Sequence, residues 1–87
     1  MTGATHNDAE TLALAALTAT LTDERRAERF LSLTGLSPDG IRSRLGDPSL
    51  LAACIGFLEA HEPDLISVSD DIGVKPEALL RAKAELE

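Results

Sequence analysis

A histidine surrounded by carboxylates is the arrangement in this chain that comes nearest to a chemical site. In the segment EAHEPD, His61 has Glu59, Glu62 and Asp64 as neighbours. Imidazole and carboxylate groups bind zinc, and carboxylates also bind harder cations. A zinc-protease helix needs a second histidine four residues after the first, and Leu65 stands there instead. We interpret the segment as a solvated turn between helices and predict no metal ligands, and the sequence leaves open whether this cluster binds a cation.

The single cysteine, Cys54, is predicted to be a buried thiol within the apolar run LAACIGF. A lone cysteine forms no internal disulfide and no zinc site by itself, and a buried thiol packs as a small hydrophobic group. No Ser-His-Asp or Cys-His spacing can be assembled, and there is no phosphate-binding loop. The sequence therefore predicts a protein that is not an enzyme, with no catalytic residues and no cofactor.

The segment LTGLSPDG could join the two helices of a DNA-reading helix-turn-helix. Gly35 would supply the turn and Ile41 an apolar contact between the helices. The helix that would read bases carries Arg42 and Arg44 beside Asp39, and the net charge of the chain is −7. A surface this acidic repels DNA. We predict a linker between packed helices, and the alternative function is a degenerate helix-turn-helix regulator that binds DNA only as a dimer or in a larger complex.

Local signals along the chain predict an all-α fold in one domain, residues 1–87. Each of the four prolines stands where a helix can begin, because the first helical N–H has no intrahelical partner. The stretch DLISVSDDIG could form a strand, but Leu65, Val68 and Ile72 repeat with helical spacing. We expect a compact bundle of five to six short helices after a disordered N-terminus, residues 1–7. The predicted helices cover residues 8–21, 23–34, 38–45, 48–60, 63–72 and 76–86.

The two halves of the chain resemble each other at an offset of 38 residues. The segment GLSPD, which starts at Gly35, aligns with GVKPE, which starts at Gly73. Either glycine can close a helix in the left-handed conformation. The sequence leaves open whether the bundle consists of two pseudo-repeated three-helix units, because helix-turn-helix segments also look alike by chance.

Composition narrows the classes of partner. Residues 1–45 carry a net charge of −1 and residues 46–87 a net charge of −6. A strongly acidic surface repels DNA and anionic lipid, and it favours either solubility or a basic partner. The chain has two phenylalanines and no Trp or Tyr, so it offers no aromatic platform for stacking bases. The start MTGATHNDAE lacks the features of a signal peptide, and no apolar run is long enough to span a bilayer. We expect a cytoplasmic protein.

Two long stretches, ERFLSLTGLSPDGIRSRLGDPSLLAACIGFLEAHEPDL and IGVKPEALLRAKAEL, resemble a family of small alphaproteobacterial proteins. This is the domain-of-unknown-function family three-five-seven-two. The resemblance implies a helical, cytoplasmic, bacterial protein and brings no known activity with it. It rests on packing and turn residues, namely Arg29-Phe30-Leu31, Thr34-Gly35-Leu36, Pro38, Pro48, Phe57-Leu58, Glu62, Gly73 and Pro76-Glu77.

An apolar patch is predicted where the second helix passes into its turn. Phe30, Leu33 and Leu36 follow one another at three-residue spacing, with Arg26 and Arg29 as a rim. Apolar patches bordered by arginine are typical of interaction sites. The alternative is that Phe30 and Leu36 close the core. We predict a small acidic protein-interaction module or adaptor, a monomer or homodimer, that binds an unknown protein partner and neither nucleic acid nor membrane.

Overall fold

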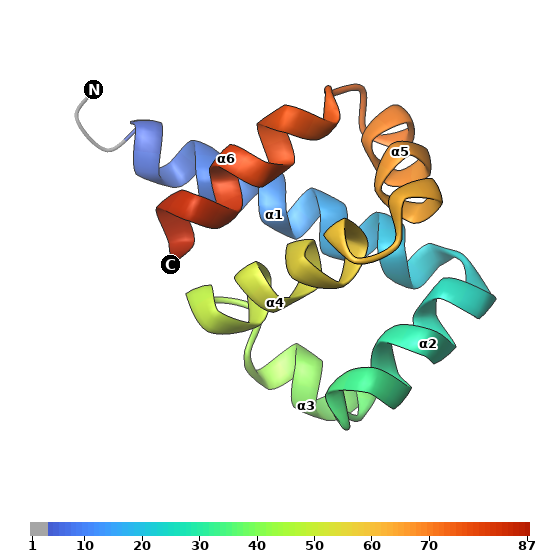
Figure 1. Ribbon diagram of the computed structural model, residues 1–87. Helices are drawn as coiled ribbons and strands as arrows, with labels where there is room; N and C mark the ends of the chain where they lie inside the picture. Colours follow the sequence, from blue (N-terminus) through green and yellow to red (C-terminus); the bar gives the residue numbers. More distant parts are fainter. Residues whose placement is uncertain (1–3) are drawn as a thin grey trace.

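Most helices of the protein begin at a proline or at a capping side chain. The computed structural model describes residues 4–87, with side chains from Ala9 onward. Figure 1 shows six helices and no strand in this part of the chain. They are α1 (Ala4–Thr22), α2 (Glu24–Thr34), α3 (Pro38–Ser43), α4 (Pro48–Glu59), α5 (Glu62–Asp71) and α6 (Pro76–Leu86).

The all-α bundle predicted from the sequence is confirmed, and the bounds of α2 to α6 agree with the predicted ones to within two residues. The stretch that could have been a strand is α5. The first helix differs, since α1 begins at Ala4 rather than at residue 8. Residues 1–3 of the predicted disordered segment lie outside the described residues, and positions 4–7 belong to α1.

Side-chain oxygens cap three of the helices. Asp23 accepts hydrogen bonds from the backbone N–H groups of Arg25 and Arg26, at 2.9 and 3.1 Å. Ser37 accepts one from Gly40 at 3.0 Å, and Asp47 accepts one from Ser49 at 2.8 Å. Each of these bonds satisfies a backbone donor that has no partner within its helix. The capping residues therefore fix where α2, α3 and α4 begin.

The two aspartate caps predict a loss of stability in acid. The N–H of Arg26 holds the pKa of Asp23 below its usual value, and the N–H of Ser49 does the same for the pKa of Asp47. A carboxyl whose pKa is lowered by folding stabilises the protein above its unfolded pKa, near 3.9, and this stabilisation is lost as the pH falls through the folded pKa. We expect the free energy of unfolding to fall below about pH 4.

Urea unfolding at a series of pH values measures this acid effect. A double variant, Asp23→Ser with Asp47→Ser, keeps a cap oxygen at both sites but removes the two titrating groups. Its free energy of unfolding should fall less steeply below about pH 4 than that of the unchanged protein. Equal slopes would show that these caps do not carry the effect.

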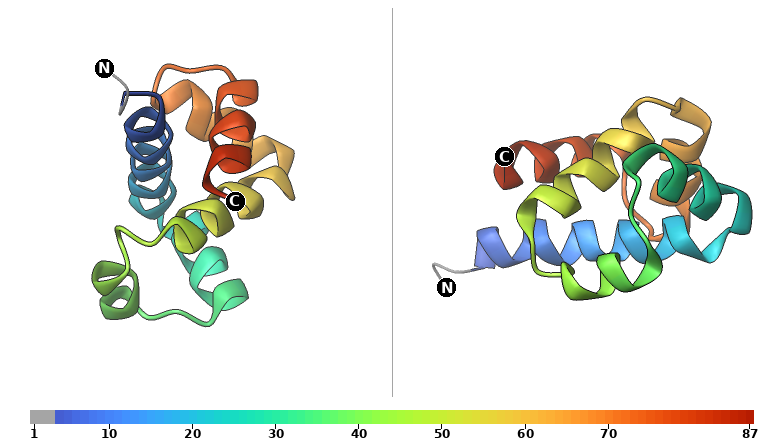
Figure 2. Two further views of the ribbon diagram at one scale, coloured as in Figure 1. Left: turned by 90° about the vertical axis from the view of Figure 1, so that its left-hand side faces the viewer. Right: turned by 90° about the horizontal axis from the view of Figure 1, so that it is seen from below.

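The core lies between α1, α4 and α6, which pack against one another. Figures 1 and 2 show α4 passing through the middle of the molecule, with α2 and α3 at one end. One face of α4 is entirely buried, and its residues are Leu50, Leu51, Cys54, Ile55 and Leu58. Phe30 of α2 is also fully buried, and its ring meets Phe57 edge to face, with 5.3 Å between centroids. These contacts fix α2 against the centre of the bundle.

The two halves share the order of their elements but not their packing. Gly35 and Gly73 both adopt the left-handed conformation, with φ of 72° and 75°, after α2 and α5 respectively. However, α6 packs against α1 and α4, whereas α3 makes no comparably extensive contact with any helix. The 38-residue similarity therefore reflects two alike turns and not two equivalent three-helix units.

Cys54 is a buried thiol, as predicted. Its exposed fraction is 0%, and its Sγ lies 3.7 Å from Oγ1 of Thr20. Burial raises the pKa of Cys54 to about 11, against a smaller opposite effect of the Thr20 hydrogen bond. The thiolate is the reactive form, so we expect no reaction of the native protein with Ellman's reagent at about pH 8, where an exposed cysteine thiol is already partly ionised.

The matched measurement is the same reaction in concentrated guanidinium chloride, where Cys54 should react completely. Thiol release from the native protein at the rate of the unfolded one would contradict the buried state.

Candidate functional site

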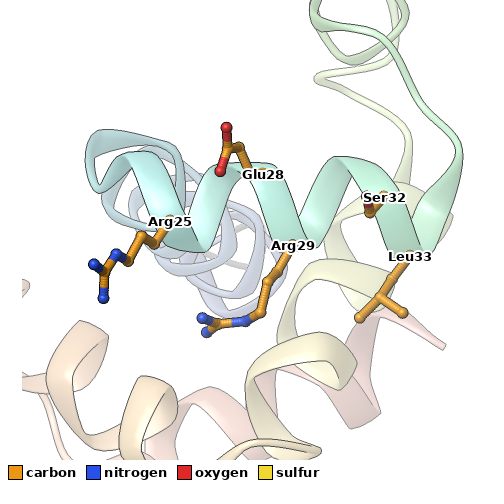
Figure 3. A pocket seen from close by; sticks show the side chains of 5 residues that line it. All are labelled: Arg25, Glu28, Arg29, Ser32 and Leu33. Carbon is orange, nitrogen blue, oxygen red and sulfur yellow. The ribbon is translucent and has the colours of Figure 1, made fainter.

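One side of α2 presents arginine and leucine side chains to solvent. Arg25, Arg29 and Leu33 follow one another at four-residue spacing, and Figure 3 shows all three projecting from the same side of the helix, whereas Glu28 projects from the other. With Glu28 and Ser32 they line a shallow depression of about 460 Å³. Leu33 is 76% exposed, the highest value among the exposed large apolar residues. An apolar side chain of this size gains free energy when a partner covers it.

Arg29 is held in place by two contacts. Its guanidinium lies over the ring of Phe57, 6.0 Å from the centroid, and it forms an ion pair with Asp64 of α5. Nδ1 of His61 is 3.1 Å from the same Asp64 carboxylate. The Asp64 carboxylate therefore already contacts both Arg29 and His61. Through Asp64, the predicted EAHEPD turn helps to hold α2 in place. We call Arg25, Arg29, Leu33 and the half-buried Phe57 the α2 surface.

Arg25 differs from Arg29 in having no such support. Its backbone N–H donates to Asp23, but its guanidinium forms no hydrogen bond or ion pair with the described residues. The side chain is exposed at the N-terminal end of the α2 surface. An unpaired guanidinium can form a bidentate bond with an incoming carboxylate.

Three residues of the predicted patch do not lie on the α2 surface. Phe30 is fully buried in the core, so the alternative prediction holds for that side chain. Leu36 is half-buried and lies near Gly40 at the start of α3. Arg26 is only 7% exposed and cannot form a rim. Of the five predicted partner-binding residues, Arg29 and Leu33 remain.

Arg26 ties three helices together instead. It donates to the backbone carbonyl of Ala19 at 2.8 Å and to Oγ of Ser67 at 3.2 Å, and it lies 3.7 Å from a carboxylate oxygen of Asp71. Its Nε is buried without a partner among the described residues. The Ala19 carbonyl belongs to the last turn of α1, where carbonyl groups have no intrahelical partner. Arg26 therefore joins the end of α1 and the side of α5 to α2.

The exposure of Leu33 follows from its position along α2. Arg26 contacts Ser67 and Arg29 contacts Asp64, so α2 and α5 run in opposite directions along each other. One further turn brings Leu33 beyond the start of α5 at Glu62. Leu33 points in nearly the same direction around α2 as Arg26, but within residues 4–87 no helix lies alongside to cover it. The spacing of residues along the sequence could not show that Arg26 is buried and Leu33 exposed. It also gave no signal for the contact of Phe57 with α2.

Other candidate sites gain no support from the geometry. Arg42 and Arg44 of the helix-turn-helix segment pair with Asp39 at 2.8 Å and with Asp47 at 3.0 Å. Each of these two guanidinium groups thus already has a neighbouring carboxylate as its partner. Among the described residues there is no group of three or more His, Cys, Asp or Glu side chains that could hold a metal ion. In the same part of the chain, no helix has both the length and the apolar character needed to cross a membrane.

Comparison with known proteins identifies the family of this chain but gives no activity for it. Neither the curated proteins nor the solved structures contain a match to the chain. A family model for a protein of unknown function, DUF3572, matches residues 6–87. The predicted family is confirmed by this match, while the alphaproteobacterial origin stays a prediction. Since the match extends from α1 to the last residue, the chain belongs to the DUF3572 family of proteins of unknown function.

Proposed function

We propose that this protein is an interaction module without catalytic activity, which binds a protein partner through the α2 surface. The observation that carries the proposal is the 76% exposure of Leu33, which lines one depression together with Arg25 and Arg29. Arginine and aromatic side chains are enriched at the energetic centres of interfaces. The proposal places the protein in the cytoplasm as a monomer or homodimer.

The support of Arg29 favours binding at this surface. Its guanidinium is positioned by Asp64 and Phe57 before any partner arrives. Ordering a long side chain on binding costs about 0.5–1.5 kcal/mol. A partner that contacts Arg29 avoids much of this cost, so the same contacts produce a tighter complex.

Replacing Leu33 with aspartate should abolish partner capture without unfolding the protein. The side chain is largely exposed, so its loss changes the free energy of unfolding little, whereas a carboxylate at the centre of an interface would be buried without a dedicated partner. We expect affinity for the captured partner to fall at least about tenfold, as for other central interface residues.

The experiment is affinity capture from an extract of the cells that produce the protein, followed by calorimetric titration of the purified partner. Ile66→Asp is the matched control, because Ile66 is also an exposed aliphatic residue, 53% exposed, on α5. A partner retained by Ile66→Asp and lost by Leu33→Asp supports the proposal. A partner that Leu33→Asp still binds with unchanged affinity would refute it.

A further inference from the structure

Arg25 carries a positive charge that no carboxylate of the described residues pairs with. Oδ1 of Asp23 accepts hydrogen bonds from the backbone N–H groups of Arg25 and Arg26, and it forms no ion pair with the Arg25 guanidinium. The side chain is exposed, and Figure 3 shows it extending from the same side of α2 as Arg29 and Leu33. A guanidinium in this state is open to a carboxylate from outside, with which it can form two parallel N–H···O bonds.

The charge of Arg29, by contrast, is already offset within the protein. Its Nη2 contacts a carboxylate oxygen of Asp64, whose side chain is only 13% exposed. Glu28 is the third charged residue that lines the depression on α2, and its carboxylate projects from the other side of the helix (Figure 3). Of the two arginines in the lining, only Arg25 therefore lacks a carboxylate partner. The depression accommodates one added negative charge, and it does so at Arg25.

The apolar part of the same depression is Leu33, which follows Arg25 by about two helical turns. Both side chains belong to its lining. The eight residues of helix between them correspond to about 12 Å along the axis of α2. Leu33 is 76% exposed, because it lies beyond the first residue of α5, Glu62. The depression thus combines an unpaired cation and an uncovered aliphatic side chain at a fixed separation.

We infer that the depression on α2 binds one α-helix of a different protein, which packs an aliphatic side chain against Leu33 and bonds Arg25 with a carboxylate about two turns away. This inference rests on the proposed function and names the chemistry of its partner. An extended segment satisfies its backbone groups by joining the edge of a sheet, and residues 4–87 contain no strand. A helix bonds its own backbone, so only its side chains need partners on this surface.

A second copy of the chain supplies the wrong charge for this depression. In a two-fold contact the same face meets itself. Two α2 helices that cross at Arg29 would place one Arg29 against the other, and Arg25 of each copy against Leu33 of the other. Glu28 projects from the other side of the helix, so this contact brings no carboxylate to Arg25. A net charge of −7 also opposes self-association and repels duplex DNA, whereas the inferred partner needs only a single carboxylate.

Three synthetic peptides of about six helical turns test the inference. The first has two leucines, one turn apart, at its centre and a glutamate two turns before and two turns after them, so that it can bind in either direction. The second has glutamine in place of the glutamates, and the third has alanine in place of the leucines. Each is titrated into the full, ¹⁵N-labelled chain and followed by NMR, and a short DNA duplex is titrated in parallel. We expect the first peptide to shift the amide signals of Arg25, Arg29 and Leu33, and the other two to bind at least about fivefold more weakly.

Two arginine variants test the carboxylate contact. Arg25→Met keeps a long side chain and a good helix former but removes the guanidinium. Arg81→Met makes the same exchange at an exposed arginine of α6 outside the lining residues. The circular dichroism of both variants should match that of the unchanged protein. With Arg25→Met the glutamate and glutamine peptides should bind equally, because the glutamate has lost its partner. With Arg81→Met the glutamate peptide should keep its advantage of at least about fivefold.

Several results would overturn the inference. They are an absence of shifts with the first peptide, shifts confined to other surfaces, equal binding of the glutamate and glutamine peptides to the unchanged chain, or a preference for glutamate that persists in Arg25→Met. Shifts of Arg25 and Leu33 on addition of the DNA duplex, or on concentrating the chain alone, would also overturn it in favour of nucleic acid or a second copy. If Leu33→Asp abolishes capture of a partner but the first peptide leaves α2 unchanged, the proposed function stands and only this inference fails.

Discussion

Replacing Phe30 with alanine is expected to lower the free energy of unfolding by about 3–5 kcal/mol. Phe30 is fully buried and is one of the two aromatic residues of the chain. Its ring joins α2 to α4 through an edge-to-face contact with Phe57. Truncation removes that contact and leaves a cavity that the short aliphatic side chains around it cannot fill completely. The free energy of unfolding of a native protein is only about 5–15 kcal/mol in total, so this loss would be a large fraction of it.

Urea unfolding followed by circular dichroism measures this loss. Phe57→Ala is the control, because Phe57 is only half-buried and removes less surface from water. We expect the Phe57 variant to lose clearly less stability than the Phe30 variant. A loss below about 1 kcal/mol for Phe30→Ala would show that α2 is not anchored through this ring.

Replacing Arg26 with alanine should cost about 2–3 kcal/mol, an unusually large effect for an arginine. The change removes two hydrogen bonds, to Ala19 and to Ser67, and the ion pair with Asp71. It also removes the buried aliphatic stem of the side chain. The last turn of α1 then loses the donor for the Ala19 carbonyl, so α1, α2 and α5 become less firmly joined.

Two further variants separate the causes of that loss. Arg25 lies one residue earlier and its side chain is exposed, so Arg25→Ala should change the free energy of unfolding by less than about 0.5 kcal/mol. Arg26→Met keeps most of the buried volume but none of the hydrogen bonds. Its loss of unfolding free energy should lie between those of Arg25→Ala and Arg26→Ala. If Arg26→Ala is as mild as Arg25→Ala, the contacts of Arg26 do not stabilise the bundle.

The positions of most helices could be predicted because their signals are local. Pro38, Pro48 and Pro76 fit the first turn of a helix but not its interior. Asp23 and Ser37 are side chains that cap helices. The start of α1 has no proline, and this is the boundary that the sequence placed wrongly.

The candidate site could be predicted only in part, because exposure depends on contacts between distant segments. Arg26 and Leu33 both occur on α2 in the same register, and the sequence assigned them to one patch. In the structure α5 lies beside Arg26 and covers it. Leu33 lies beyond the first residue of α5, Glu62, and stays exposed. Phe57 joins the site across a gap of more than twenty residues from Leu33, for which no sequence spacing gives a signal.

Site-specific photocrosslinking in living cells tests the central claim most directly. The photoreactive residue p-benzoylphenylalanine is placed at position 33 in one variant and at position 66 in another, since Leu33 and Ile66 are both exposed aliphatic residues. If the α2 surface binds a protein partner, irradiation gives a discrete higher-mass adduct from position 33 and none of that mass from position 66. An adduct from position 66 alone, or no adduct from position 33 in cells where the protein is present and folded, would contradict the account.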